Sequence, residues 1–508
     1  MSCTVASEES LTSVVEACRI AEDHWAAGRG GAAVEAAWKA YDVELGSREA
    51  KVLLSELLFW FPAEIRFARR EGLLKLLRDL EIDPDYIGMY TWFFLLQNRY
   101  LRAVQTNSDF SALAAFLNED ELALTVLHES AVCHRVAESV LTRLRRWLLT
   151  SGKWPDYQHL VDALVAQTAI NRGAWPFDSA ENLLLRDMSE APIFRTYFPF
   201  CEGPSSLPEV TSSNPVTQAV TQGYERWPFP VWRRVSVRGP ERLGDRIRQL
   251  DPSGPSNFPI KANLLIAGCG TGKEAASVAV RYRDAVVTAI DVSESSLRFA
   301  KRQCSTLGLN NIRFLKLDLH DVSKLKERFD AIFCSGVLHH LPDPESGLKA
   351  LGTVLQPAGV MRIMVYSRTA RLWLTAARTL IHDLAAEPPS DDLLRRIRQG
   401  VMGQNNCWRA NFLMSWPDFS TLPGTYDLLL HSHEDPFDIS RISQVLHRLG
   451  LRLLSFQLPT PYARACYRKK FPDDPMQRNA KYLASFERDN PTVFFGMYDF
   501  WCRDQTSS

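Results

Sequence analysis

The sequence predicts an α/β fold in which a parallel sheet follows an all-helical N-terminal region. In residues 9–187, apolar side chains recur at the three- and four-residue spacing of amphipathic helices. From Lys261 onward, short apolar runs alternate with helix-like segments, which is the pattern of a parallel sheet with helices on both faces. We therefore expect two differently built halves.

Length and composition agree with a globular chain of several domains. The 508 residues are 46% hydrophobic and 23% charged, as is ordinary for a soluble protein. Lys plus Arg and Asp plus Glu are equal at 59 each, so a nucleic-acid partner is not favoured. The N-terminus has no signal-peptide pattern and no apolar run is long enough to span a bilayer, so we expect a cytoplasmic protein without membrane contact.

The ten cysteines indicate a reducing compartment and no metal centre. None stands in a C-x-x-C pair, and their spacings do not match a zinc site. Scattered thiols in a large chain are typical of small buried residues.

Three parts are expected along the chain. Residues 1–200 form an all-helical N-terminal domain, and residues 201–258 form a linker followed by an aromatic, proline-rich lid segment. The linker is predicted from EGPSSLPEVTSSNP, which is rich in Pro, Ser and Gly. Residues 259–508 form the α/β domain, with a helical insertion over residues 368–434.

The α/β domain begins with strands and helices in regular alternation. Strands are expected over residues 264–268, 284–291, 312–318, 329–337 and 359–367. Between them, helices are expected over residues 274–282, 293–304 and 345–355. After the insertion we expect a helix over 438–450, a strand over 451–458, a helical piece over 472–487 and a last strand within 492–504.

The stretch LLIAGCGTGKEAA, residues 264–276, could bind a triphosphate, a dinucleotide or another ligand. A P-loop requires a glycine where the chain has Ala267, and a hydroxyl residue where it has Glu274. The dinucleotide pattern G-x-G-x-x-G fits Gly268 and Gly270, but its third glycine falls on Lys273. Both patterns therefore fail. A third glycine pattern remains, and an ordinary tight turn between a strand and a helix is the alternative to it.

The pattern G-x-G-x-G does fit, with Gly268, Gly270 and Gly272. Such a turn lets a ligand approach the backbone closely. Asp291 ends the second strand, where a carboxylate can accept both hydroxyls of a ribose. Asp318 ends the third strand, in position to meet an adenine amino group, and SGVLHHLPDP ends the fourth. Each feature alone could be a cap or a turn, but together they indicate a nucleoside site at the carboxyl edge.

With these motifs in this order, residues 261–367 resemble class I S-adenosylmethionine-dependent methyltransferases, which have a Rossmann-like sheet. The resemblance implies S-adenosyl-L-methionine as the cofactor. It also implies a set of cofactor-binding residues, namely Tyr224, Gly268, Cys269, Gly270, Thr271, Gly272, Asp291, Val292, Asp318, Leu319, Ser335, Gly336 and Val337. The chain departs from the family just before the glycine turn. Many members carry an acid there that helps to hold the methionine end, and this chain has Ala267.

The segment YERWPFPVW, residues 224–232, resembles the YEENPYPRW segment of a group of large bacterial methyltransferases, often joined to tetratricopeptide-like helices. Rigid prolines beside large aromatics suggest a lid over the cofactor, with Tyr224 near the methionine carboxylate. An anchor between two domains is the alternative interpretation.

Methyl transfer from a sulfonium is an in-line displacement that needs positioning more than acid–base chemistry. His339 and His340 are the nearest candidate bases, and His431 in HSHE is another. Two histidines and a glutamate on a loop could also bind a metal, but the signal is weak and we expect none.

The resemblance implies a methyltransferase that acts on an O, N or C nucleophile of a small molecule, a peptide or a protein. The alternative is an inactive methyltransferase-like scaffold with a helical interaction domain. A nicotinamide oxidoreductase is disfavoured by Lys273. The insertion is expected to cover the substrate, or else to mediate a homodimer or an interdomain contact.

Overall fold

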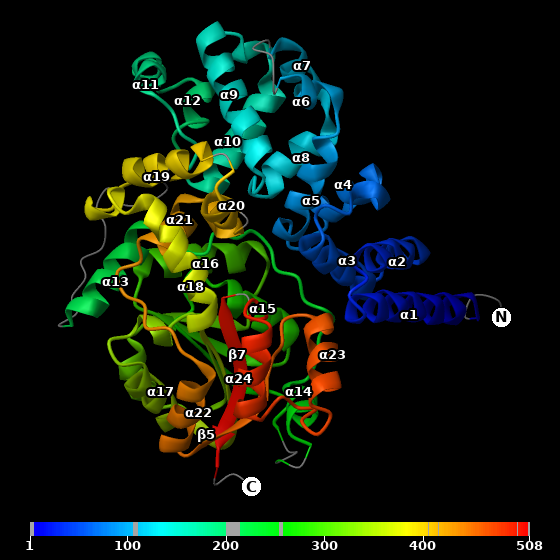
Figure 1. Ribbon diagram of the computed structural model, residues 1–508, viewed down its shortest axis with the longest axis vertical. Helices are drawn as coiled ribbons and strands as arrows, with labels where there is room; N and C mark the ends of the chain where they lie inside the picture. Colours follow the sequence, from blue (N-terminus) through cyan, green and yellow to red (C-terminus); the bar gives the residue numbers. More distant parts are fainter. Residues whose placement is uncertain are drawn as a thin grey trace.

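The computed structural model describes residues 5–104, 110–199, 214–252, 254, 258–404, 406–414, 416–494 and 496–505 (Figure 1). The predicted linker falls mostly on residues 201–213, which lie outside the described residues. Among the described helices, none combines the length and the apolar character that crossing a lipid bilayer requires.

The second half of the chain contains a seven-stranded sheet in the order β3-β2-β1-β4-β5-β7-β6. Its strands are β1 (Asn263–Ala267), β2 (Val286–Asp291), β3 (Ile312–Lys316), β4 (Phe329–Ser335), β5 (Leu355–Tyr366), β6 (Leu451–Phe456) and β7 (Met497–Asp504). The first five strands are parallel, as the sequence predicts. Their carboxyl ends therefore meet at one edge of the sheet.

The last strand makes the sheet mixed, in a direction that was not predicted from the sequence. β7 lies between β5 and β6 and is antiparallel to both. The end of β6 lies opposite the middle of β7, where Phe456 pairs with Phe500. Two helices in succession, instead of one crossover helix, return the chain to the edge where β6 ends. The strand–helix alternation of the sequence does not encode this return.

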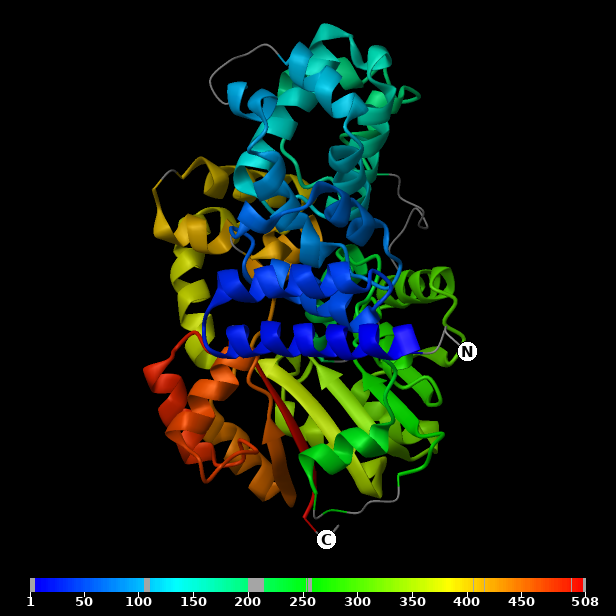
Figure 2. The same ribbon diagram turned by 90° about the vertical axis from the view of Figure 1, so that its right-hand side faces the viewer.

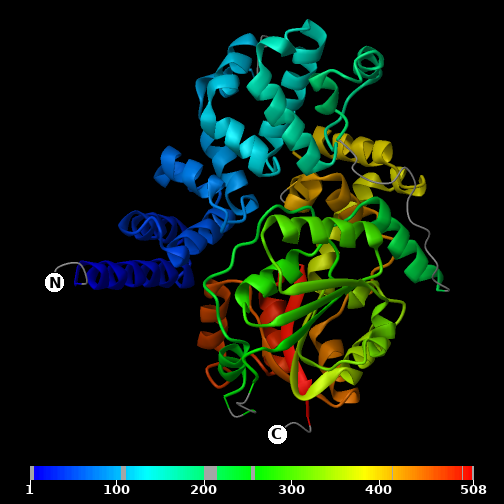
Figure 3. The same cartoon turned by 180° about the vertical axis from the view of Figure 1, so that it is seen from behind.

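Helices cover both faces of the sheet (Figure 3). On one face, α14 (Leu243–Leu250), α15 (Lys273–Arg281) and α16 (Glu294–Thr306) pack their apolar sides on β1 and β2. On the other face lie α17 (Pro344–Thr353), α22 (Ile439–Arg448), α23 (Pro461–Lys470) and α24 (Ala480–Asp489). The short turns η3 (Leu319–Leu325) and η4 (Leu338–His340) follow β3 and β4.

The described residues before 200 are helical, as the spacing of apolar residues predicts. They have a hydrophobic core of their own that includes Trp38, Trp92 and Trp175. The elements are α1 (Val5–Ala26), α2 (Gly30–Val43), α3 (Arg48–Trp60), η1 (Ile65–Phe67), α4 (Arg70–Arg78), α5 (Asp85–Leu95), α6 (Arg99–Ala103), α7 (Ser111–Glu119), α8 (Glu121–Glu129), α9 (Arg135–Ser151), η2 (Trp154–Asp156), α10 (Gln158–Asn171), α11 (Ser179–Leu185) and α12 (Pro192–Arg195). The first helix, α1, lies against α23 (Figure 2).

The insertion lies between the N-terminal helices and the sheet (Figure 1). Arg398 of the insertion is fully buried and forms an ion pair with Glu138 of α9. Its elements are α18 (Arg368–Arg378), η5 (Thr379–Ile381), η6 (Leu384–Ala386), α19 (Asp391–Gly403), α20 (Trp408–Met414), η7 (Pro417–Ser420) and α21 (Leu422–Leu429). The insertion thus makes the interdomain contact that was one of the expected alternatives. A remaining helix, α13 (Pro215–Arg226), ends within the segment 224–232 and contains its first three residues.

Candidate active site

The glycine turn joins β1 to α15 at the carboxyl edge of the sheet. Gly268, Gly270 and Gly272 have φ angles of +71°, +51° and +86°, a region that side chains rarely allow. A Cβ atom on Gly268 would lie 2.3 Å from Val337, and one on Gly270 would lie 3.0 Å from the carbonyl oxygen of Phe229. Both conformation and close contact therefore require glycine here. Cys269 and Thr271, the residues between the glycines, are buried.

Asp291 at the end of β2 is held directly against this turn. Its Oδ2 accepts a hydrogen bond from the amide of Gly270 at 2.7 Å, and its Oδ1 accepts one from the amide of Ser293 at 2.8 Å. Burial raises the pKa of Asp291, while these amide hydrogen bonds oppose the increase. The half-buried Val292 follows it. The two sequence motifs therefore meet in space, as the carboxyl-edge argument predicts.

The segment that contains Tyr224 fixes the start of α16. Glu225 accepts hydrogen bonds from the amides of Glu294 and Ser295, at 2.6 and 3.0 Å. A carboxylate at this position is stabilised by the helix N-terminus. The hydroxyl of Ser293 donates to the carbonyl oxygen of Tyr224 at 3.3 Å. This places Tyr224 next to the residues that follow Asp291.

The aromatic segment continues across the glycine turn. The hydroxyl of Thr271 donates to the carbonyl oxygen of Pro230 at 2.6 Å. The indole nitrogen of Trp232 donates to the carbonyl oxygen of Thr271 at 2.8 Å, and the ring is 1% exposed. Trp232 is therefore an anchor, while Pro230 and Phe229 cover the turn. The contacts of Trp232 agree with the anchor interpretation, and the lid over the cofactor stays a prediction.

The other predicted cofactor residues follow β3 and β4 at the same edge. The Oδ1 atom of Asp318 accepts a hydrogen bond from the amide of His320 at 2.8 Å, so Asp318 begins the turn η3, and Leu319 beside it is buried. At the end of β4, the hydroxyl of Ser335 donates to Glu274 at 2.8 Å. Gly336 follows it with a φ angle of +76°. The adenine contact predicted for Asp318 stays a prediction.

Tyr224 makes a contact that the sequence does not predict. Its hydroxyl donates to Oδ1 of Asp427 in α21 at 2.8 Å, and the hydroxyl of Tyr366 lies 3.3 Å from Oδ2 of the same carboxylate. The only proton of the Tyr224 hydroxyl is thus used by Asp427. A hydrogen bond from this hydroxyl to a methionine carboxylate, as expected from the sequence, would have to replace that contact.

The three predicted histidines do come together. The rings of His340 and His431 stack with their centroids 3.8 Å apart, and His339 lies 4.3 Å from His340. Burial lowers the pKa of all three imidazoles, and for His340 the neighbouring histidines add to the effect. The rings are therefore held neutral at pH 7.

Hydrogen bonds distinguish the three rings. Nδ1 of His340 lies 2.8 Å from the carbonyl oxygen of His433, so it must donate a proton and its Nε2 keeps a lone pair. Nδ1 of His339 accepts from the amide of Tyr366, and Nδ1 of His431 accepts from the amide of His433. In these two neutral rings the proton lies on Nε2. Only His340 of the three thus offers Nε2 as a proton acceptor.

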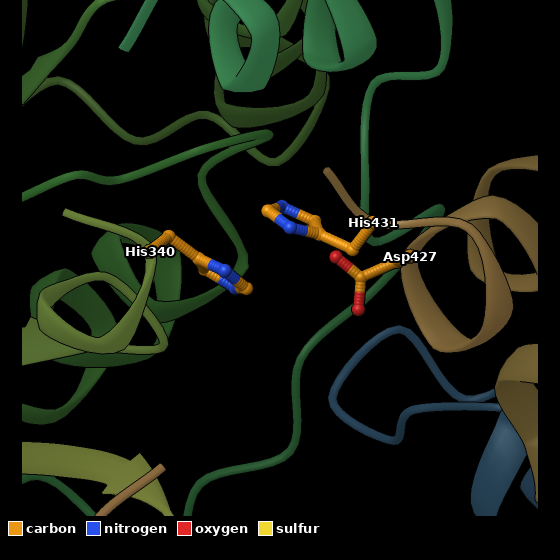
Figure 4. Close-up of side chains that lie close together, drawn as sticks. All are labelled: His340, Asp427 and His431. Carbon is orange, nitrogen blue, oxygen red and sulfur yellow. The ribbon is translucent and has the colours of Figure 1, made fainter. Parts of the chain in front are cut away.

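His340, His431 and Asp427 also have the composition of a metal-binding group, with ligand atoms within 4.8 Å of one another (Figure 4). The two imidazole planes, however, are inclined by only 28° in a stacked arrangement. Lone pairs lie in the ring planes, so stacked rings do not direct them to one point. Both oxygens of Asp427 also contact tyrosine hydroxyls. The geometry favours a hydrogen-bonding network over a metal centre.

The N-terminal helices contribute charged groups to this region. Lys273 in the first turn of α15 forms an ion pair of 2.8 Å with Asp83. Burial is the largest single effect and lowers the pKa of Lys273, but Asp83, Tyr86 and Asp85 together outweigh it and raise the pKa. Burial together with the charge of Asp83 raises the pKa of Asp85 to about 6. Burial and the charge of Asp427 likewise raise the pKa of Asp418 to about 6.

Sequence reasoning missed Asp427, Asp418, Asp85 and Glu274. One signal was available for Asp427, because it is a single charged residue in the otherwise apolar and buried helix α21. Asp418 and Asp85 belong to a short turn and a helix start, where aspartate is common without any functional role. Nothing in their local sequence marks them.

Comparison with known proteins agrees with this geometry. The family model described as "Methyltransferase domain" matches residues 264–359. An uncharacterized protein of Synechococcus is 31% identical over 268 residues, covering 47% of this chain and 60% of that protein. A ubiquinone biosynthesis O-methyltransferase of Coxiella burnetii is 32% identical over 112 residues, covering 22% of this chain and 47% of that enzyme.

Among solved structures, PKMT2 from Rickettsia typhi in complex with AdoHcy is 18% identical, with a TM-score of 0.37, and the match covers 51% of this chain and 52% of that one. The chain spans about half to 60% of the length of the curated relatives named here. The match over residues 264–359 includes the glycine turn between β1 and α15, so this segment is similar to the methyltransferase domain, and the strand order of the sheet is that of the predicted Rossmann-like fold.

Proposed function

We propose that this chain is an S-adenosyl-L-methionine-dependent methyltransferase that transfers a methyl group to a nucleophile on a small molecule, a peptide or a protein. The observation that supports this best is the contact between Asp291 and the amide of Gly270, at 2.7 Å. It places a carboxylate beside a turn of three left-handed glycines, within the segment that matches the methyltransferase domain.

The residues present fit this cofactor. The glycine turn leaves no room for side chains, and Asp291 presents acceptors for the hydroxyls of a ribose. Asp318 and Leu319 would lie at the adenine, and Ser335, Gly336 and Val337 would lie at the methionine end. The bound cofactor supplies an activated methyl group on a sulfonium. The chain has to position the acceptor and remove its proton.

His340 is the residue that we assign as the general base. Its Nδ1 donates to the carbonyl oxygen of His433, so Nε2 is able to accept a proton. Burial lowers its pKa, which keeps the ring neutral at pH 7. In this proposal His431 stacks on His340 and orients it, while His339 fixes the end of β5 through the amide of Tyr366.

A hydroxyl is the first acceptor to test. An oxygen nucleophile must lose its proton as the methyl group arrives, and a neutral imidazole can take it. The name of the curated relative from Coxiella burnetii, an O-methyltransferase, supports the same order of testing. Nitrogen and carbon acceptors follow in the screen.

The helical region is proposed to complete this active site. In this proposal the chain has three parts, residues 1–200, 201–258 and 259–508, and the third part contains the insertion over 368–434. Asp83 and Asp85 reach the region of Lys273 and Asp418 from the start of α5. This favours a direct role for the N-terminal helices at the acceptor side.

An inactive scaffold finds no support in the comparisons. The family model describes a methyltransferase domain, and the relative from Coxiella burnetii is named as an O-methyltransferase. Calorimetric titration with S-adenosylmethionine and S-adenosylhomocysteine tests the proposal. We expect binding by the wild type and a loss of roughly 30-fold or more in Asp291→Ala, because two ribose hydrogen bonds to a charged group disappear.

Asp284→Ala is the matched control, because Asp284 is an exposed aspartate just before β2. Its affinity should equal that of the wild type. Failure of the wild type to bind either ligand, also in the presence of candidate acceptors, would overturn the proposal. Binding of a nicotinamide dinucleotide instead would favour an oxidoreductase.

A further inference from the structure

The position before the glycine turn cannot contribute a charge to a ligand. Ala267 is the last residue of β1, is fully buried, and has only a methyl side chain. The resemblance leads us to expect an acid here that helps to hold the methionine end. If the chain binds the same cofactor, its ammonium group needs a different partner.

Glu274 lies on the other side of the same turn. It is the second residue of α15, two residues after Gly272, and its side chain is half-buried. Its Oε1 accepts a hydrogen bond from the hydroxyl of Ser335 at 2.8 Å. Ser335 ends β4 and is one of the predicted cofactor residues. The Glu274 carboxylate therefore reaches the place where the methionine end is expected.

The charge around Glu274 is not balanced. Arg362 of β5 donates two hydrogen bonds to Asp499 of β7, at 3.0 and 2.6 Å. Its remaining contact with Glu274 is longer, 3.4 Å. Two carboxylates thus share one guanidinium, which leaves a net charge of about −1 on the three side chains. One additional cation would neutralise the group.

We propose that Glu274 replaces the acid missing at Ala267 and binds the ammonium group at the methionine end of the cofactor. The inference rests on the proposed function and identifies a binding residue that neither the motif nor the family match indicates. In the structure Oε2 of Glu274 has no hydrogen bond among the described residues, so it is available for an N–H donor.

An ammonium group would fit the electrostatic environment of this carboxyl. Burial raises the pKa of Glu274, and Arg362, the Ser335 hydroxyl and Arg281 only partly oppose this. An ammonium group at hydrogen-bond distance would favour the ionised carboxylate and restore its pKa toward ordinary values.

Two ligands separate this role from a structural one. S-adenosylhomocysteine carries the ammonium group, whereas 5′-methylthioadenosine shares the adenosine and the thioether but lacks the amino-acid end. In Glu274→Gln we expect the affinity for S-adenosylhomocysteine to fall roughly 10- to 100-fold, as for the loss of one charge-assisted hydrogen bond. The affinity for 5′-methylthioadenosine should stay unchanged, because glutamine keeps the volume and can still accept from Ser335.

Glu327→Gln is the matched control, since Glu327 also pairs with an arginine but lies far from the glycine turn, just before β4. It should bind both ligands as the wild type does. Asp499→Asn provides a second test that leaves Glu274 in place. Arg362 would lose its main partner and pair more closely with Glu274, so the same selective loss of S-adenosylhomocysteine affinity is expected.

Equal losses for both ligands in Glu274→Gln would show a structural role and overturn the inference, as would an unchanged affinity for S-adenosylhomocysteine. In both cases the proposed function would stand, because the wild type binds. A wild type that binds neither ligand would overturn the proposed function and this inference together.

Discussion

The ammonium group of Lys273 lies 2.8 Å from the carboxylate of Asp83, so the residue that follows the glycine turn is joined to the N-terminal helical region by an ion pair. The Asp83 side chain is 2% exposed. Its backbone amide also donates to the hydroxyl of Ser236 at 2.7 Å, in the segment that leads to the α/β domain. Three parts of the chain therefore meet at this one aspartate.

The first prediction concerns this ion pair. Lys273→Met should lower the free energy of unfolding by about 2–4 kcal/mol, because it leaves the buried charge of Asp83 unpaired. Asp83→Asn should be destabilising as well, but the double variant should lose less than the sum of the two single variants. Urea unfolding of the four proteins gives the coupling. Additive losses would mean that the two side chains have no coupling energy.

The second prediction compares two glycines with nearly the same backbone. Gly268 and Gly308 have φ angles of +71° and +68°. A Cβ on Gly268 would lie 2.3 Å from Val337, whereas nothing lies within 4 Å of one on Gly308. Gly308→Ala should therefore cost only the backbone strain, about 1 kcal/mol, and leave cofactor affinity unchanged.

Gly268→Ala should cost more, about 2–4 kcal/mol in total, because Val337 must move. It should also weaken binding of S-adenosylhomocysteine, since Val337 is a predicted cofactor residue. Thermal unfolding and calorimetry on both variants check this. Equal effects of the two substitutions would show that the contact with Val337 has no consequence.

The third prediction follows from Asp418, whose pKa is raised to about 6 in the folded protein. The folded state then binds the proton more tightly than the unfolded state, where the carboxyl has a pKa of about 3.9. This group therefore destabilises the fold progressively as the pH rises from about 4 to 6, and the full penalty is present at pH 7.

Asp418→Asn should accordingly raise the free energy of unfolding by about 1–3 kcal/mol at pH 7, and the gain should shrink toward pH 4. The control is Asp392→Asn, because the Asp392 side chain is 79% exposed. Urea unfolding at several pH values provides the measurement. A gain that does not depend on pH would exclude titration of Asp418 as its origin.

The fourth prediction concerns the protonation of the three histidines. Burial lowers the pKa of His340, so the ring should stay neutral as the pH falls through the ordinary histidine range near 6.5. Its proton should lie on Nδ1, and that of His339 and His431 on Nε2. Long-range proton–nitrogen NMR correlations on histidine-labelled protein report both properties.

His382 is a control residue in the same spectra, because it is exposed. A spectrum in which His340 carries its proton on Nε2 would remove it as the proposed base, since the lone pair would then face the carbonyl oxygen of His433.

Much of the fold could be predicted because local patterns determine it. The strands from Asn263–Ala267 to Leu355–Tyr366 are apolar runs bounded by turns, and their parallel order follows from the helices between them. The glycine turn and Asp291 could be placed together because both end parallel strands at one edge. The direction of β7 could not be predicted, since it depends on how two helices return the chain.

The contacts of the histidine cluster could not be predicted from the sequence, for a different reason. Asp427 is 203 residues from Tyr224 along the chain, yet the two share a hydrogen bond. No periodicity or spacing reports such a pairing. Lys273 illustrates the same limit, because in the sequence it only breaks the dinucleotide pattern, and its ion pair with Asp83 becomes visible only in three dimensions.

The anchoring of Trp232 has a consequence for how this chain can be recombined. Its indole nitrogen holds Thr271, its carbonyl oxygen accepts from Gln303 at 2.7 Å, and Glu225 caps α16 nearby. A fragment that began at the first strand would lack Trp232 and Glu225, so Thr271 and the start of α16 would lose these contacts and the turn would be exposed. A fragment designed for fusion to another protein should therefore include residues 224–232 along with the sheet, so the unit that keeps the turn intact is larger than the segment of the family match.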